Sequence, residues 1–242
     1  MNDEKRYPGE RWQPLPHVAP DSLKNKALFG LRLLLDLEVA TTYRDLKEFL
    51  SQLKNNVLEI GCGLKPYRHL VPSDGKYRAI DWEKSQTLFH YKSDEVLYYN
   101  GDRFPLQDNS YYCVFHTEVL EHVYDLRRFL SECHRVLSPQ GRMFFTVPFA
   151  ARYHYIPNDY WRFTPASLER LLKEAGFDSI KVKPRGSDIA VALLKMNAVF
   201  FRLIFARSEN LILKMISLLF FGLLFAVPIL LFVILGHLSI FL

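Results

Sequence analysis

The chain has 242 residues, of which 49% are hydrophobic, 14% are aromatic and 24% are charged, and its formal net charge is +5. The aromatic content excludes an intrinsically disordered chain, and three scattered cysteines exclude a small scaffold held by disulfides. About 210 residues precede an uncharged tail, which is enough for one domain with a full core but too few for two large ones.

The net charge is concentrated in residues 181–214, which hold seven basic and two acidic residues. The rest of the chain is therefore neutral. A basic segment directly before an apolar tail is typical of a protein that faces anionic lipid headgroups from the cytoplasmic side. We expect a lipid bilayer as partner and no nucleic acid.

The start of the chain and the cysteines together predict a cytosolic location for the domain. The opening MNDEKRYPGE has no apolar core, so we expect no secretory signal peptide. Cys62, Cys113 and Cys133 lie in apolar segments without CxxC spacing, which predicts buried, reduced thiols in the cytosol.

The predicted elements change character along the chain. Residues 1–21 are rich in proline and lack periodicity, which predicts a flexible arm. From Ser22 to Leu53 apolar residues recur at helical spacing, which predicts one or two helices. Short apolar runs follow, separated in the later part by helical patterns over 126–137 and 165–175. The predicted strands are 56–60, 77–81, 96–100, 112–117 and 143–148.

This alternation of strands and helices predicts an α/β fold with a Rossmann-like, mostly parallel sheet and helices on both faces. In such a sheet the ligand lies beyond the carboxyl ends of the strands. Gly61 and Gly63 follow the first strand and would let the backbone approach a ligand closely. Asp81 follows the second strand at a spacing from Gly61 that suits binding of ribose hydroxyls. The later strand ends supply Asp102, Thr117, Glu118, Glu121 and His122.

Taken together, VLEIGCG, YRAIDW and the block from GDRFPLQ to MFFTVPF resemble the class I S-adenosylmethionine-dependent methyltransferases of the type 11 group. The resemblance covers roughly residues 40–185 and implies S-adenosylmethionine as the cofactor. It implies that Asp81 holds the ribose, that Trp82 lies against the adenine and that Asp102 accepts from the adenine amino group. The implied cofactor-binding residues are Glu59, Gly61, Cys62, Gly63, Asp81, Trp82, Asp102, Arg103 and Thr117.

Two departures limit this resemblance. The glycine loop lacks the third glycine of a dinucleotide fingerprint, which disfavours NAD. After SIKVKP (179–184) the chain turns hydrophobic, so the seventh strand of the fold is expected to be missing or replaced.

Methyl transfer requires an acceptor held in line with the methyl group and, for an oxygen or nitrogen acceptor, a nearby base. His122 and His154 are the candidate bases, with Glu118 or Asp159 as orienting carboxylates; a capping or packing role for each histidine stays open. His116 is expected to be structural. We expect no metal, although a site of Glu118, Glu121 and His122 is conceivable. The run DYWRFTPASLERLLKEAGF resembles the segment that follows the sheet motifs in many family members acting on glycans, lipids or quinones. The candidate substrate-binding residues are Tyr155, Asp159, Tyr160, Trp161 and Arg162.

The C-terminal region is predicted to meet a membrane. Residues 216–235 are uncharged and would span a hydrocarbon core of ~30 Å as a helix, kinked at Pro228. Before them, polar residues recur every seven positions from Asp188 to Glu209, which predicts an amphipathic helix. We expect a single span, or else a hairpin that enters one leaflet. The predicted units are an arm (1–21), a methyltransferase domain (22–186), a connector helix (187–209) and a membrane-embedded tail (210–242).

These features predict methyl transfer to an oxygen, less readily to nitrogen or carbon, of a membrane-associated acceptor. A lipid-linked sugar, a glycolipid or an isoprenoid quinone would suit a tethered enzyme. Two alternatives are a non-catalytic scaffold that binds S-adenosylmethionine in a membrane complex, and a methyltransferase for a soluble small molecule whose tail mediates oligomerisation.

Overall fold

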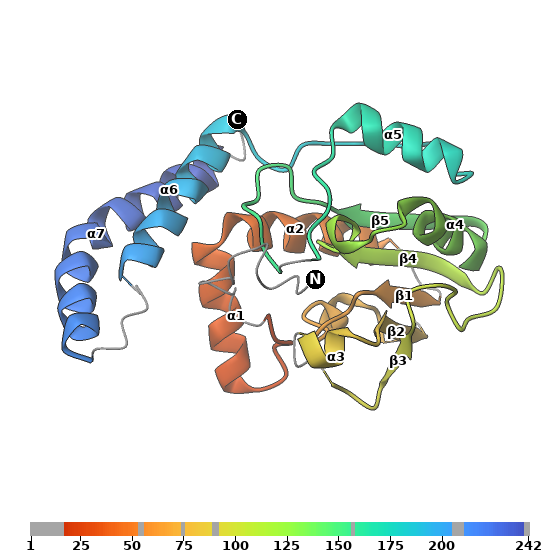
Figure 1. Ribbon diagram of the computed structural model, residues 1–242, viewed down its shortest axis with the longest axis horizontal. Helices are drawn as coiled ribbons and strands as arrows, with labels where there is room; N and C mark the ends of the chain where they lie inside the picture. Colours follow the sequence, from red (N-terminus) through yellow and green to blue (C-terminus); the bar gives the residue numbers. More distant parts are fainter. Residues whose placement is uncertain are drawn as a thin grey trace, which may run out of the picture.

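A parallel sheet of five strands lies at the centre of the protein (Figure 1). The computed structural model describes residues 17–52, 56–73, 76–88, 92–155, 158–204 and 211–239. The strand order is β3-β2-β1-β4-β5, and every neighbouring pair is parallel. This confirms the predicted Rossmann-like sheet. The strands are β1 (Val57–Ile60), β2 (Tyr77–Trp82), β3 (Val96–Tyr99), β4 (Tyr111–Thr117) and β5 (Leu137–Thr146).

Helices cover both faces of the sheet because alternate strand residues point to opposite sides. On one face Leu58 and Val114 pack with α4 (Leu126–Val136) and α5 (Pro165–Glu174). On the other face Val57 and Phe115 pack with α1 (Leu23–Leu35) and α2 (Leu37–Ser51). Three short helices lie in the connections: η2 (Arg68–Leu70), α3 (Ser85–Leu88) and η3 (Leu120–His122).

Side-chain caps fix where the helices next to the sheet edge begin. The carboxylate of Asp125 accepts from the backbone N–H of Arg128 at 3.1 Å and starts α4. The Thr164 hydroxyl accepts from the N–H of Ser167 at 3.2 Å and starts α5, with Pro165 at the first helical position. These caps satisfy N–H groups that have no partner within their helices, so the loops before α4 and α5 end at defined points.

The far edge of the sheet differs from the regular pattern. β5 begins at Leu137, earlier than predicted, and its pairing with β4 shifts register between Tyr111 and Cys113. Within the described ranges no strand follows β5, and residues 179–184 form no regular element. The sequence predicts that the closing strand of the fold is missing or replaced. In the described residues the sheet ends at β5.

The start of the described chain packs against the domain. His17 stacks on Phe29 with ring centroids 5.1 Å apart and meets the edge of Tyr67 at 5.3 Å. The predicted arm (1–21) otherwise falls mostly on residues 1–16, which lie outside the described residues.

Two C-terminal helices, α6 (Asp188–Ile204) and α7 (Leu211–Ser239), lie along each other beside α1 and α2 (Figure 1). Phe200 of α6 stacks on Phe225 of α7 with centroids 4.3 Å apart. At the C-terminal end of α7, the His237 ring nitrogen Nε2 lies 3.0 Å from the carbonyl of Leu34, and Gly236 packs on Leu37. The far end of α7 thus returns to the junction of α1 and α2. The predicted connector helix corresponds to α6, and Glu209 lies outside the described residues.

One helix in the described part of the chain is long and apolar enough to cross a membrane. Its most apolar stretch, Gly222–Ser239, has a mean hydropathy of 2.3, and 22% of it is buried. Leu223 is 80% exposed and Val227 is 74% exposed. α7 therefore presents large aliphatic side chains to its surroundings over most of this stretch.

Candidate functional site

The first group of site residues lies where β1 and β2 end. Gly61 and Gly63 have φ angles of +64° and +49°, a backbone conformation that favours glycine. The N–H of Gly63 donates to the Asp81 carboxylate at 2.9 Å, and the N–H of Gly61 donates to the carbonyl of Ile80 at 2.9 Å. The glycine loop and the acidic end of β2 are thereby held together at the sheet edge.

The Asp81 carboxylate is held by backbone N–H groups in a position to accept further hydrogen bonds. Its second oxygen accepts from the N–H of Trp82 at 2.7 Å, and the residue is only 7% exposed. Burial raises the pKa of Asp81, and the backbone donors at Gly63 and Trp82 oppose that shift. A carboxylate has about four lone-pair positions, so those left after two backbone bonds suit the two hydroxyls of a ribose. The indole of Trp82 follows directly, with the Lys84 ammonium 5.3 Å from its ring centroid.

Glu59, near the end of β1, and Cys62, within the glycine loop, are both buried. Glu59 accepts a hydrogen bond from the Tyr77 hydroxyl of β2. Burial raises the pKa of Glu59 to about 8, and the bond from Tyr77 opposes that shift. The Cys62 thiol lies 3.9 Å from the Asp81 carboxylate, and burial followed by the nearby acid raises its pKa. As a neutral, buried thiol, Cys62 would meet a ligand through its backbone.

The predicted residues after β3 and β4 lie closer to solvent. Asp102 is exposed and forms an ion pair with Arg128 of α4, and Arg103 lies 3.7 Å from Asp108. Thr117 ends β4, where it pairs with Thr146 of β5. Asp102 and Arg103 are therefore at the rim of the site rather than inside it.

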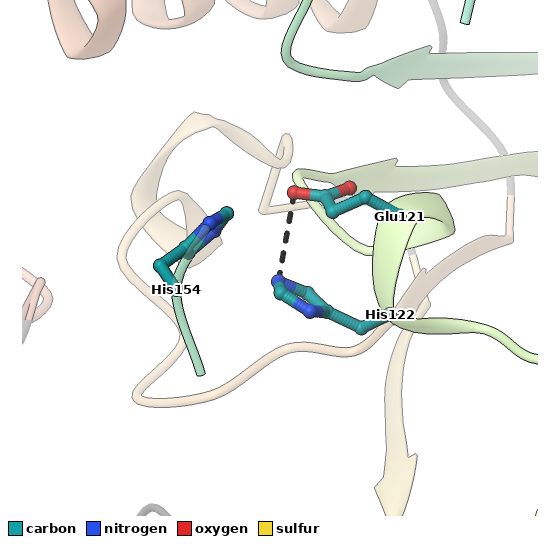
Figure 2. Close-up of side chains that lie close together, drawn as sticks. All are labelled: Glu121, His122 and His154. Atoms are coloured by element: carbon teal, nitrogen blue, oxygen red, sulfur yellow. Dashed lines mark ion pairs between the residues drawn. The ribbon is translucent and has the colours of Figure 1, made fainter. Parts of the chain in front are cut away.

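A second group of side chains converges beyond β4 and β5. Glu121 and His122 come from η3, and His154 comes from the loop after β5 (Figure 2). His122 Nε2 lies 3.6 Å from Glu121 Oε1, and the two histidine rings meet edge to face with centroids 5.0 Å apart. The Tyr155 ring lies 5.4 Å from that of His122. The structure thus brings the two predicted bases together.

Burial sets the protonation of this group. Burial lowers the pKa of His122 to about 4, so its ring is neutral at pH 7. Burial, with Glu118 nearby, raises the pKa of Glu121 well above its ordinary value. Glu121 is 0% exposed, and within the described part of the chain neither of its carboxylate oxygens has a hydrogen-bond partner.

Asp159 and Arg162, predicted to bind substrate, support the loop that carries His154. Asp159 Oδ2 accepts from the backbone N–H of His154 at 3.0 Å and lies 3.0 Å from its Nδ1. Arg162 donates to both Asp159 oxygens, at 2.6 and 2.8 Å, and to the carbonyl of Arg152 at 2.9 Å. Of the two candidate orienting carboxylates, Asp159 is the one that contacts His154.

Two other predicted acceptor residues form an exposed rim. Tyr160 is 41% exposed and donates through its hydroxyl to Asn158 Oδ1 at 3.0 Å. Trp161 is 40% exposed and donates from Nε1 to the carbonyl of Val123 at 2.9 Å. Phe163 is in the core. The aromatic faces at 160 and 161 are held in place and remain accessible.

Glu118 has a different partner from the one expected. Its Oε1 accepts from Arg185 Nη2 at 2.7 Å, and the same guanidinium donates to the carbonyl of Glu38 in α2 at 3.2 Å. The carboxylate next to His122 is Glu121. Part of the basic segment before the tail is therefore used inside the protein, where Arg185 joins α2, Glu118 and the start of the C-terminal region.

Sequence reasoning missed the partners Tyr77 and Arg185. Tyr77 could have been found from the parallel register, because it pairs with Val57, whose side chain shares a face with that of Glu59. Arg185 is one of seven basic residues in its segment and had no distinguishing signal. His116 is buried and stacks on Phe145 at 4.9 Å, as a structural residue would.

Comparison with known proteins agrees with this geometry. Residues 58–145 match a protein family described as a methyltransferase domain. A relative in Mycolicibacterium smegmatis, described as a probable S-adenosylmethionine-dependent methyltransferase, is 32% identical over 137 residues, which cover 51% of this chain and 52% of the relative. A relative in Mycobacterium tuberculosis with the same description is 32% identical over 97 residues, which cover 38% of this chain and 35% of the relative. The chain spans about half the length of the first relative and about a third of the length of the second.

Solved structures share the fold. A protein from Galdieria sulphuraria, described as a sarcosine dimethylglycine methyltransferase, superposes with a TM-score of 0.52 at 19% identity and covers 83% of this chain and 82% of its own. Phosphoethanolamine N-methyltransferase 2 from Haemonchus contortus, solved with S-adenosyl-L-methionine, superposes with a TM-score of 0.52 at 15% identity. The match covers 86% of this chain and 56% of that protein.

Proposed function

We propose that the chain is a class I S-adenosylmethionine-dependent methyltransferase and that it transfers a methyl group to an oxygen of a membrane-associated acceptor. One observation carries this proposal. The Gly63–Asp81 contact and the His122–His154 pair follow strands of one parallel sheet at its carboxyl edge, where such sheets bind ligands.

The residues at the ends of β1 and β2 fit S-adenosylmethionine. Asp81 would accept from the ribose hydroxyls, and Trp82 would lie against the adenine. Glu59 and the loop of Gly61, Cys62 and Gly63 would surround the methionine part, where the backbone can approach the ligand closely. At the rim, Asp102 and Arg103 would meet the adenine, and Thr117 would line the methionine end.

The acceptor side would supply orientation and proton removal. In the reaction the acceptor oxygen forms a bond to the methyl carbon as the bond from carbon to sulfur breaks, and the sulfonium becomes a neutral thioether. The acceptor proton must leave, and an imidazole nitrogen of His122 or His154 would take it. Asp159 would position His154, and Glu118 would act through its ion pair with Arg185. Tyr155, Tyr160 and Trp161, with Arg162 supporting their loop, would border the acceptor.

The C-terminal helices support a membrane location with the catalytic domain on the cytoplasmic side. α7 presents large aliphatic side chains outward. Because Arg185, just before α6, and His237, at the end of α7, both contact the domain, the arrangement favours a hairpin that enters the bilayer from one side over a single span. Tethering raises the local concentration of enzyme only for a substrate in the same membrane. A lipid-linked sugar, a glycolipid or an isoprenoid quinone would suit this arrangement.

The test uses the full chain in detergent, incubated with S-adenosylmethionine labelled in its methyl group and with fractionated membranes. We expect label in the lipid-extractable fraction. Label found only in water-soluble acceptors contradicts the membrane acceptor. The variant His154→Ala should bind S-adenosylmethionine normally and lose transfer. If neither protein transfers label to any fraction while both bind the cofactor, the chain is a scaffold.

A further inference from the structure

We propose that Glu121, His122 and His154 form a binding site for one divalent transition-metal cation. Nothing in the family match or in the described relatives assigns a metal to this chain. One ligand atom from each of the three side chains lies within 4.8 Å of the other two. Figure 2 shows the three groups facing a common space between η3 and the loop after β5.

The carboxylate of Glu121 is the first observation that calls for a ligand. It is 0% exposed, and neither oxygen has a hydrogen-bond partner among the residues that the structure describes. A buried polar group without a partner destabilises the folded state, and a charged group does so more strongly. Buried carboxylates are therefore normally paired with a cation or bound to a metal. A cation between Glu121 and the two rings would give this carboxylate its missing partner.

The two histidines are held in the form that binds metals. His122 Nδ1 lies 2.6 Å from the carbonyl of Asn158, which can only accept, so Nδ1 carries the proton. His154 Nδ1 lies 2.9 Å from the carbonyl of Arg152 and 3.0 Å from Asp159 Oδ2, which also accept. In both rings this leaves Nε2 as the nitrogen with a lone pair. A carbonyl or carboxylate that fixes the other ring nitrogen is the usual outer support of a metal-binding histidine.

The ligand set selects the class of metal. Two imidazole nitrogens and one carboxylate oxygen suit zinc and neighbouring first-row divalent ions better than calcium or magnesium, which prefer oxygen ligands. Zinc bonds of about 2.0–2.1 Å place tetrahedral ligand atoms about 3.4 Å apart. His122 and Glu121 are already 3.6 Å apart, so binding requires mainly that His154 move inward with its loop.

The site would act on the acceptor and therefore rests on the proposed function. Three protein ligands leave a coordination position open, as in catalytic zinc sites. An acceptor hydroxyl bound there would have a lower pKa and would lose its proton to solvent. The resulting oxyanion would form the new bond to the methyl carbon while the bond from carbon to sulfur breaks. The cation would thus replace direct proton transfer to a histidine.

The test measures metal binding directly. Tag-free full-length protein is stripped with a chelator and titrated with Co²⁺, whose absorption spectrum reports nitrogen and oxygen coordination, and then with Zn²⁺ in competition. We expect one equivalent to bind. Glu121→Gln, which keeps the side-chain shape, and His154→Ala should each weaken binding at least tenfold. The control His69→Ala removes an exposed histidine outside the cluster and should bind as the wild type does.

The outcomes separate this inference from the proposed function. Wild-type protein that binds no stoichiometric metal, or variants that bind it as tightly as wild type, overturns the inference. Methyl transfer that continues unchanged in chelator also overturns the metal's role and leaves the proposed function standing. Stoichiometric binding that depends on Glu121 and His154, without methyl transfer to any acceptor, supports the metal site and contradicts the proposed function. A thermal melt of each variant excludes unfolding as the cause of lost binding.

Discussion

The proposed cofactor side, at the ends of β1 and β2, and the proposed acceptor side, at η3 and the loop after β5, satisfy their buried polar groups in different ways. On the cofactor side, Asp81 accepts from the backbone N–H groups of Gly63 and Trp82, and Glu59 accepts from Tyr77. On the acceptor side, Glu121 has no hydrogen-bond partner in the described ranges, and His154 is held by Asp159 from within its own loop.

This difference separates a preformed site from an incomplete one. Strand ends and backbone amides hold the cofactor side, so it needs little rearrangement to bind a ligand. A loop after β5 closes the acceptor side, whose buried carboxylate still requires a partner. We therefore expect changes on the cofactor side to alter binding of S-adenosylmethionine, and changes on the acceptor side to alter turnover.

The largest expected effect is on cofactor affinity. Asp81→Ala removes the acceptor proposed for the ribose hydroxyls and leaves the Gly63 N–H without its partner. Hydrogen bonds to a charged group contribute about 1.5–3 kcal/mol each, so affinity should fall about 100-fold or more. Isothermal titration of S-adenosylmethionine measures this. Glu83→Ala, an exposed carboxylate two residues on, is the control and should bind normally.

The second effect tests how tightly the glycine loop is built. An added Cβ at Gly61 would lie 2.5 Å from Val119 Cγ2, at a φ of +64°. Gly61→Ala should therefore lower the free energy of unfolding by about 2–3 kcal/mol, within the cost of overpacking a core. Gly30→Ala is matched to it, because nothing lies within 4 Å of that position in α1, and it should stabilise the helix by about 1 kcal/mol. Denaturant unfolding that shows equal effects for the two variants contradicts the structure of the loop.

The third effect sharpens the distinction between the two sides. Asp159→Asn weakens the support of His154 and Arg162 without removing either side chain. Turnover should fall about tenfold, as for other outer supports of functional histidines, with the KM for S-adenosylmethionine unchanged. A rise in that KM would mean that the two sides are not separable. Asp178→Asn, an exposed acid beyond α5, serves as the control.

The fourth effect concerns the pH dependence of stability. Glu59 has its pKa raised to about 8 in the folded protein, against an ordinary 4.5, so the folded state holds a proton that the unfolded state has lost. The stabilising contribution of this proton is present below about pH 4.5 and is lost as pH rises through about 8, at up to about 1.4 kcal/mol per pH unit. Glu59→Gln should flatten that decline in melts from pH 5 to 9. A decline of the same slope in the variant would assign it to another group.

Much of the fold could be predicted because it rests on local patterns. The runs at 56–60 and 77–81 became β1 and β2 almost without change, since near-continuous apolar strands and a glycine turn are local signals. The early start of β5 at Leu137 could not be predicted, because it depends on pairing with Tyr111 across the sheet. The cofactor residues next to β1 and β2 were placed together for the same local reason. The pairing of Glu118 with Arg185 could not be predicted, because the two residues lie 67 positions apart in the chain.

The end of the sheet at β5 has a consequence for self-association. An outer strand without a neighbour offers free backbone groups to a strand of another molecule. Here the ladder with β4 passes from Leu137 directly to Arg142, and the residues between include Pro139, which has no N–H, and Gln140 with a φ of +63°. The straight part of the edge is thereby shortened to Arg142–Thr146 and begins with a positive charge. Short, bulged and charged edges are the means by which soluble proteins discourage strand exchange, and β5 combines all three.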